Sequence, residues 1–285
     1  ERLSFHLAVP AQDDVFASTE VSASAREKGV GLEASLREAI ARGNVHGVVA
    51  IGLKEKTVGW IMEHGIPVVG FASASTPHSV VLDKQHFAEQ GVHELARRGC
   101  RRIALWTPQI GGDLPGSLAQ HHAEQLRAFQ HALAEHELVF YPRLLRGVWQ
   151  LAEQVAPGAE NAAHNEASET IYPPFGEQGY RAALGTWRLP RNAWPDGILV
   201  TDDLMMQGAL GGMRECGVEV GRDVKVVSHA NVGSPTLLGY EKDLTLLEVN
   251  PSEIVEVLFS TLDKAMNGGQ APTLIRLQAH FRTPT

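Results

Sequence analysis

Cysteine is scarce in this 285-residue chain, which contains only two. Cys100 and Cys216 lie far apart in the sequence, and neither belongs to a Cys-x-x-Cys pair. Small secreted proteins that depend on disulfides carry more cysteines at closer spacings, so we do not expect a disulfide framework. The pattern favours a reducing compartment and predicts a cytoplasmic protein.

Long apolar runs and an excess of positive charge are also lacking. No stretch approaches the ~18 consecutive apolar residues of a membrane-spanning helix, and the first residues, Glu-Arg-Leu, do not begin a signal-peptide core. The chain has 25 Lys and Arg residues against 33 Asp and Glu, a formal net charge of −8. Nucleic-acid-binding domains usually present a basic surface, so we expect neither a membrane partner nor direct binding to DNA.

Sequence motifs for catalysis and cofactor binding are missing as well. The 13 histidines are scattered and form no His-Glu-x-x-His pattern, and there is no phosphate-binding loop or Gly-x-Ser-x-Gly turn. Residues 29–34 match Gly-x-Gly-x-x-Ala, but they follow a predicted helix and not the first strand, so no dinucleotide site is expected there. We therefore predict no metal, no cofactor and no enzymatic activity; an enzyme built on crevice carboxylates is an alternative for which no nucleophile–base pair is visible.

The sequence does contain a regular alternation of short apolar runs and amphipathic helical segments. Hydrophobic residues make up 44% of the chain, enough for one large or two medium domains. The apolar runs expected to form buried strands include residues 3–9, 47–51, 67–71, 102–106, 197–200, 224–227 and 244–249. Helical segments between such runs predict an α/β fold with parallel sheets.

Residues 194–231 show this alternation most clearly. A buried strand at 197–200 is followed by a helix that Asp202 or Asp203 can cap, and a second strand follows at 224–227. In such βαβ units, ligands bind beyond the carboxyl ends of the strands. The polar residues at 201–203 and 228–231 come directly after the two strands, so we predict a binding crevice there.

A set of short segments occurs in an order and spacing that is typical of one family. They are residues 96–104 (Ala-Arg-Arg-Gly-Cys-Arg-Arg-Ile-Ala), 127–133, 179–184, 195–198, 202–203 and 223–227. Together they resemble the effector-binding domain of LacI/GalR-type transcriptional regulators, over about residues 3–283. The resemblance implies a periplasmic-binding-protein-like α/β fold, with two doubly wound parallel-sheet subdomains joined by three crossovers.

The resemblance also implies how the chain is divided. Residues 1–108 and 245–267 are expected to form the N-terminal subdomain. Residues 109–230 and 272–285 are expected to form the C-terminal subdomain, with 231–244 and 268–271 as crossover segments. An effector bound in the cleft between subdomains would close them, and the closure would be transmitted to a DNA-binding module that lies outside this chain.

Ligand contacts of the family are carried over position by position. They fall on Asp13, Phe16, Asp83, Gln125, Phe175, Asp202 and Asn231. Gln125 stands where an arginine is common, and Ala230 stands where a carboxylate is common. Because a fixed positive charge is lost, we expect a neutral carbohydrate or related polyol and not a sugar phosphate or sugar acid. Asp83 and Asp202 are expected to accept its hydroxyl groups from opposite subdomains.

Simpler roles exist for the same residues. Asp83 and Asp203 both precede helices, and each can be only an N-cap that contributes about 1 kcal/mol. Gln125 can be a solvated helix residue, and Phe16 and Phe175 can be core aromatics.

The preferred function is a ligand-sensing domain of a bacterial regulator. It would form a homodimer and reach DNA only through a missing N-terminal domain. The alternative is a solute-binding protein of a sugar transporter, which shares the same architecture.

Overall fold

The computed structural model describes residues 32, 34–53, 55–71, 76–109, 116–147 and 173–283. The chain forms two compact units, each built from separate segments of sequence. Unit 1 comprises Glu1–Val81, Pro115–Leu118 and Ser252–Leu277, and unit 2 comprises Leu82–Leu114, Ala119–Pro251 and Gln278–Thr285. None of the helices in the described ranges is long and apolar enough to cross a membrane.

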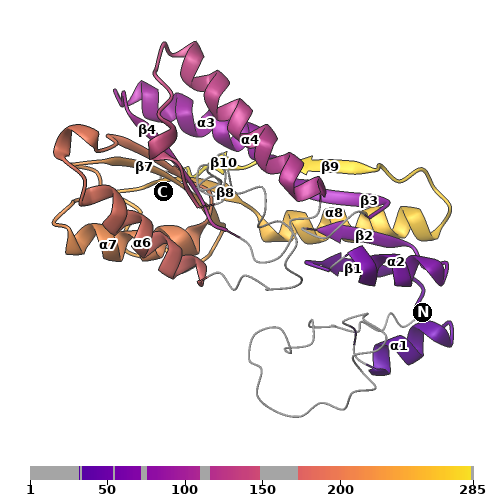
Figure 1. Cartoon of the computed structure of the whole chain (residues 1–285). Helices are drawn as coiled ribbons and strands as arrows, with labels where there is room; N and C mark the ends of the chain where they lie inside the picture. The colour runs from indigo at the N-terminus through magenta and orange to yellow at the C-terminus, as the bar shows by residue number, and fades with distance from the viewer. Residues whose placement is uncertain are drawn as a thin grey trace, which may run out of the picture. The chain divides into compact units, whose positions relative to one another are not determined.

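Unit 1 contains a four-stranded sheet in the order β1-β2-β3-β9. Its strands are β1 (Val48–Ile51), β2 (Val68–Phe71), β3 (His78–Leu82) and β9 (Leu274–Leu277), and its helices are α1 (Ala34–Ala41), α2 (Glu55–Glu63) and α8 (Pro251–Met266), whose first residue belongs to unit 2. The yellow strand β9 lies beside the purple strand β3, with which it pairs, although the two are far apart in the sequence (Figure 1). Val58 and Ile61, one turn apart on α2, are buried against Val68 and supply the core of this unit.

Unit 2 contains a six-stranded sheet in the order β10-β8-β7-β6-β4-β5. Its strands are β4 (Ile103–Thr107), β5 (Arg146–Gly147), β6 (Gly197–Val200), β7 (Lys225–Asn231), β8 (Thr245–Val249) and β10 (His280–Phe281). All neighbours are parallel except β10, which is antiparallel to β8. Strands β4 and β6 are buried at every position and almost entirely apolar, with Thr107 at the end of β4 as the exception, as expected for strands that are covered on both faces.

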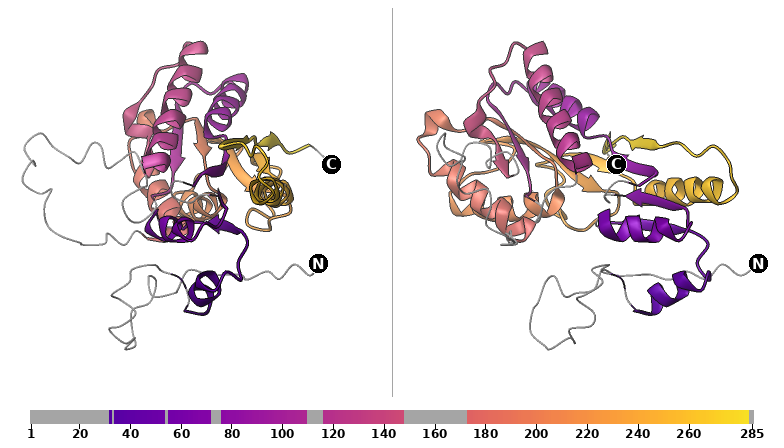
Figure 2. Two further views of the ribbon diagram at one scale, coloured as in Figure 1. Left: turned by 90° about the vertical axis from the view of Figure 1, so that its right-hand side faces the viewer. Right: turned by 45° about the vertical axis from the view of Figure 1, so that its right-hand side comes forward.

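Helices cover both faces of the unit 2 sheet. They are α3 (Lys84–Arg97), α4 (Gly116–Glu135), whose first three residues belong to unit 1, α6 (Phe175–Trp187) and α7 (Asp203–Glu215). The short helices η3 (Pro142–Leu144) and η4 (Arg191–Ala193) precede β5 and β6. Gly91 of α3 lies against Leu199, whereas Ile198 and Val200 belong to the core beneath α6 and α7. Alternate residues of a strand point to opposite faces, so α3 and α6–α7 lie on opposite sides of the sheet (Figure 1; Figure 2, right).

Helices α6 and α7 approach each other unusually closely, through glycine. A Cβ atom added at Gly208 would lie 1.7 Å from the backbone oxygen of Gly176, and one at Gly179 would lie 1.8 Å from that of Met205. Because no side chain fits there, these glycines set the distance between the two helices. The packing of α6 against α7 is therefore tightly determined near the start of α7, which follows β6.

The division of the chain differs from the expected one at two strands. The family resemblance places residues 102–106 and 245–249 in the N-terminal subdomain. In the structure β4 pairs with β6 and β8 pairs with β7, so both strands belong to the unit 2 sheet. Sheet membership depends on pairing between distant segments, which local hydrophobicity does not encode. The strand expected at residues 3–9 lies outside the described residues.

Candidate functional site

The carboxyl ends of the unit 2 strands meet at one edge of the sheet. Because β4, β6 and β7 are parallel, Thr107, Val200 and Asn231 mark this carboxyl edge. Helix α3 leads back to the start of β4, so its own first turn lies at the same edge. Helix α7 begins there directly after β6. The carboxyl edge is therefore surrounded by strand ends and helix N-termini, the usual place for a ligand in an α/β sheet.

Asp202 begins α7. Its backbone is extended (φ −151°, ψ 132°), and its Oδ1 accepts a hydrogen bond from the Met205 amide at 2.8 Å. Burial raises the pKa of Asp202, and the neighbouring charge of Asp203 raises it further, against the lowering effect of hydrogen bonds from the Met205 and Leu204 amides. Asp202 is thus a helix cap whose carboxylate is held in a partly dry environment.

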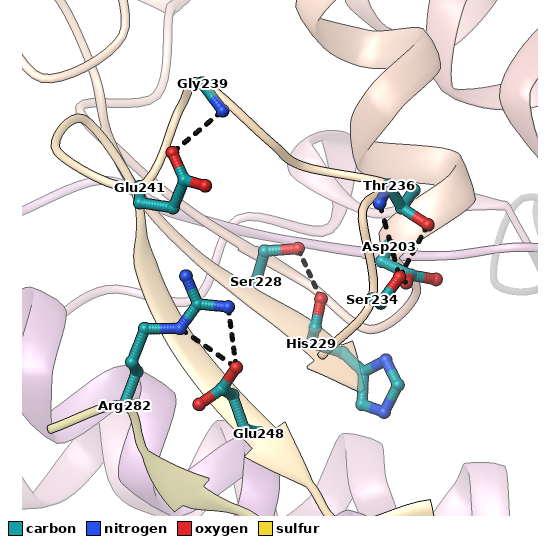
Figure 3. Close-up of polar contacts among 9 residues, drawn as sticks. All are labelled: Asp203, Ser228, His229, Ser234, Thr236, Gly239, Glu241, Glu248 and Arg282. Atoms are coloured by element: carbon teal, nitrogen blue, oxygen red, sulfur yellow. Dashed lines mark hydrogen bonds and ion pairs between the residues drawn. The ribbon is translucent and has the colours of Figure 1, made fainter. Parts of the chain in front are cut away.

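Asp203 is joined to a small group of hydroxyls after β7. Its side chain is only 8% exposed, and the Ser234 hydroxyl donates to its Oδ2 at 3.4 Å. The hydroxyls of Ser234 and Thr236 are 2.8 Å apart, and the Thr236 amide donates to Ser234 Oγ at 3.3 Å. Figure 3 shows the three side chains gathered above the end of β7. This loop therefore fixes a carboxylate beside the carboxyl edge.

His229 lies on β7 next to this group. Among the described residues neither ring nitrogen has a partner, although both atoms are shielded from solvent. Burial lowers the pKa of His229, opposed by the negative charge of Asp203, so the imidazole is neutral near pH 7. A neutral imidazole offers one donor and one acceptor, and here both are unused.

A second polar group lies between α3 and α4. The Lys84 ammonium is 3.4 Å from Nε2 of His122, and burial lowers the pKa of Lys84 to about 8. Gln125 lies one turn after His122 and is 1% exposed, and its Oε1 has no hydrogen-bond partner within the described ranges. Lys84 also lies one turn before Phe87, whose ring contacts that of His229. His229 and Lys84 thus both lie on the side of the sheet that α3 covers.

Comparison with known proteins agrees with this arrangement. The family model described as a periplasmic binding protein-like domain matches residues 92–280. The chain belongs to this family. No curated protein matches its sequence.

Several solved structures share the periplasmic-binding-protein-like fold with the chain. A LacI-family regulatory protein from Chloroflexus aggregans has a TM-score of 0.66 at 20% identity, with 87% of this chain and 78% of that chain covered. The transcription regulator CcpA of Lactococcus lactis has a TM-score of 0.64 at 21% identity, with 87% and 80% covered. A LacI family transcriptional regulator from Lactobacillus casei with bound glucose has a TM-score of 0.57 at 17% identity, with 87% and 81% covered. The expected α/β fold is therefore confirmed.

Within this family fold, the two aspartates expected on opposite subdomains lie in the same unit. Asp83 caps α3, with its Oδ1 accepting from the His86 amide at 3.0 Å, and both Asp83 and Asp202 belong to unit 2. The expectation of one carboxylate from each subdomain is therefore wrong. The expected boundary between the subdomains, after β4, was too late in the sequence. The chain enters unit 2 at Leu82, before α3.

The other expected ligand contacts have different environments. Gln125 is buried and not solvated. Phe175 begins α6 and packs against the core beneath the sheet. Asn231 ends β7, and its backbone oxygen accepts from the Ser234 amide at 3.0 Å. Asp13 and Phe16 lie outside the described residues. Gln125, Asp202 and Asn231 thus remain candidates for ligand contact in unit 2.

Sequence reasoning missed Lys84, His122 and His229. His229 stands where the family resemblance places an aromatic residue, and this substitution was a usable signal. Lys84 follows the capping Asp83 directly, and a lysine in a first turn is ordinarily read as solvated. His122 and Gln125 are spaced by three residues on one face of α4, which indicates a shared environment.

Proposed function

We propose that this chain is the ligand-sensing domain of a LacI-type transcriptional regulator, and that it binds a small sugar-like effector at the carboxyl edge of the unit 2 sheet. The observation that carries the proposal is the buried imidazole of His229 with its two unused nitrogens beside Asp203. Leaving a buried polar group without a partner costs about 1–3 kcal/mol, which a bound ligand removes. The regulators that share this fold include one with bound glucose.

Sugar hydroxyls suit the chemistry of the carboxyl edge. A hydroxyl both donates and accepts, so it can serve either nitrogen of His229. The Asp203 carboxylate accepts only, and it already receives the Ser234 hydroxyl, so a second hydroxyl donor can be added. Asn231 ends β7 at the same edge and adds a side-chain amide with donors and an acceptor. These groups favour a polyhydroxylated molecule.

Transcriptional control requires parts beyond this chain. With a formal net charge of −8, the chain is poorly suited to bind DNA alone, so the proposal places DNA binding in a further domain. It also includes a homodimer, because symmetric pairs of half-sites on DNA are matched by symmetric protein pairs. A single species of twice the 30.9 kDa chain mass in sedimentation supports the dimer, and a monomer at high micromolar concentration refutes it.

A ligand screen followed by mutation tests the binding proposal. The wild-type chain is heated with neutral sugars, sugar acids, sugar phosphates, glycosides and nucleosides, and its melting temperature is recorded. A compound at 100 times its dissociation constant stabilises the native state by about 2.7 kcal/mol. Its affinity is then measured for Asp203→Asn and for Asp243→Asn, a change to an exposed aspartate of the same unit. A tenfold loss in the first variant alone supports the site, and equal affinities refute it.

A transporter's solute-binding protein shares this architecture and is the second candidate. The described residues contain no feature that separates it from a regulator, and the solved structures reported above are regulators. Coupling between sugar and DNA binding, treated at the end of the Discussion, distinguishes the two.

A further inference from the structure

Lys84 of unit 2 is largely buried, and no carboxylate within the described part of the chain is paired with it. Lys84 lies on the face of α3 that packs on the sheet, one turn before Phe87. Its ammonium forms no ion pair with any acidic side chain of the described residues, and its one hydrogen-bond contact is His122 Nε2 at 3.4 Å. Burial lowers the pKa of Lys84, and no carboxylate of the described residues opposes that shift. A buried cation in proteins is normally paired, so an unpaired one calls for an explanation.

Within the described ranges, the neighbours of Lys84 on α4 are the hydrogen-bonding side chain of His122 and, one turn further on, that of Gln125. His122 can accept from the ammonium only through a neutral ring nitrogen. Gln125, one turn further along α4, presents a terminal amide with an unused Oε1 and can donate through Nε2. Lys84 of α3 contacts the turn of α4 that precedes Gln125, so an ammonium and an amide donor come from two adjacent helices. N–H donors beside a partly desolvated cation are groups that can bind an anion.

The position of this group relative to the family pattern is informative. The resemblance places an arginine at Gln125, and its loss was the reason to expect a neutral ligand. In the structure a cation is restored from a different helix, because Lys84 of α3 reaches the turn of α4 that carries His122 and precedes Gln125. Lys84 thus supplies a positive charge next to the turn that precedes Gln125.

We propose that Lys84, assisted by Gln125, binds an anionic group of the effector, a carboxylate or a phosphate. This inference rests on the proposed function and narrows it from sugar-like molecules in general to sugar acids or sugar phosphates. It replaces the neutral ligand expected from the sequence. Lys84 acts as the counter-charge, and Gln125 donates a second hydrogen bond to the same group.

The first experiment requires no knowledge of the effector. Inorganic phosphate is titrated into wild type, Lys84→Met and Lys84→Arg, and melting temperatures are recorded in a buffer of neutral or cationic components. Phosphate should raise the melting temperature of wild type and Lys84→Arg but not of Lys84→Met. Lys242→Met, which removes an exposed lysine of the same unit, should respond like wild type. An equal response of all four proteins, or of none, overturns the proposal.

Stability without any anion gives an independent reading. If Lys84 lacks a counter-charge, Lys84→Met should melt at a higher temperature than wild type in phosphate-free buffer. If part of the chain neutralises Lys84, the same variant should melt at a lower temperature, which overturns the proposal. Lys84→Arg, which keeps the charge, should not gain stability. A Lys84→Met protein that fails to fold counts as the second outcome.

Pairs of sugars that differ in charge test the effector class directly. Glucose is compared with glucose 6-phosphate and with glucuronate, and galactose with galacturonate, by calorimetry on the same variants. The anionic member of at least one pair should bind wild type tenfold or more tightly than its neutral partner, and Lys84→Met should lose that preference.

The two proposals fail in different ways. A neutral sugar that binds Lys84→Met as tightly as wild type overturns the anionic class but leaves ligand sensing intact. Phosphate stabilisation that depends on Lys84, with no sugar or sugar acid bound, overturns the sugar-like effector but leaves the anion site intact.

Discussion

The ring of Phe87 on α3 packs on the ring of His229 on β7, with centroids 6.3 Å apart and planes tilted by 54°. This contact covers one side of the imidazole with apolar carbon and contributes to the burial that lowers the pKa of His229. It also brings the inner face of α3, with Lys84 one turn earlier, next to β7. The contact between Phe87 and His229 therefore connects the helix that carries Lys84 with the strand that carries His229.

Replacing His229 by phenylalanine should stabilise the ligand-free protein. The change keeps a planar ring against Phe87 and removes two buried nitrogens that have no partner among the described residues, so a gain of about 1–2 kcal/mol is expected. Binding of the effector should weaken at the same time. Urea denaturation measures the first effect and calorimetry the second. His280→Phe, at an exposed histidine, is the control and should change neither.

Stability at alkaline pH should depend on Lys84. Burial lowers its pKa from 10.5 to about 8, so between these values the unfolded chain binds a proton that the native state has released, and stability rises with pH. Below about pH 8 both states are protonated and the full penalty is present, of the order of 3 kcal/mol at ~1.4 kcal/mol per pKa unit. Lys84→Met should therefore be more stable than wild type at pH 7, and the difference should shrink towards pH 10.5. A difference that stays constant with pH contradicts the burial of a charged lysine.

The role of Asp202 as a helix cap should be separable by mutation from its role as a ligand contact. Asp202→Asn keeps a capping oxygen for the Met205 amide, and it removes a carboxylate whose pKa is raised by burial, so stability near pH 7 should be unchanged or higher. Asp202→Ala should lose about 1 kcal/mol. The Asn variant should bind the effector about 1.5–3 kcal/mol more weakly if the carboxylate accepts its hydroxyls. Unchanged binding in calorimetry makes Asp202 a helix cap only.

Gly208 should not tolerate a side chain. An added methyl would lie 1.7 Å from the Gly176 oxygen, so α6 and α7 must separate, and Gly208→Ala should destabilise the protein by about 3 kcal/mol or more. Gly185→Ala is the matched control, because nothing lies within 4 Å of its Cβ position and it is an exposed residue of α6. The control should be neutral or gain up to ~1 kcal/mol from helix propensity. Chemical denaturation of both variants measures the difference.

The β6–α7–β7 unit could be predicted from the sequence because its signals are local. Gly197 to Val200 is continuously apolar, Asp202 has cap chemistry, and the helix that follows ends before Gly217, which has φ +69°. The subdomain boundary could not be predicted in the same way. The apolar sequence of strand β4 is compatible with a place in either sheet. Only its pairing with β6 shows that it belongs to unit 2.

The candidate site was predicted in part. The carboxyl edge and Asp202 followed from the βαβ pattern, and Gln125 was singled out for the arginine that it replaces. The cation was missed because Lys84 is forty-one residues before Gln125, and their nearness depends on how α3 packs beside α4. Burial of His229 was likewise hidden, since it results from a tertiary contact with Phe87.

Coupling between ligand and DNA tests the central claim most directly. The protein with its natural flanking sequence is used to select genomic DNA fragments, and the affinity for the selected fragment is measured with and without the stabilising compound from the ligand screen, at fixed salt. A sensing domain of a regulator predicts a change of five-fold or more in DNA affinity, in either direction, since allosteric coupling is typically about 1–3 kcal/mol. The change should be lost in Lys84→Met and Asp203→Asn but kept in Lys242→Met. Equal DNA affinity at zero and saturating compound, or no DNA binding, contradicts the claim and favours a solute-binding protein.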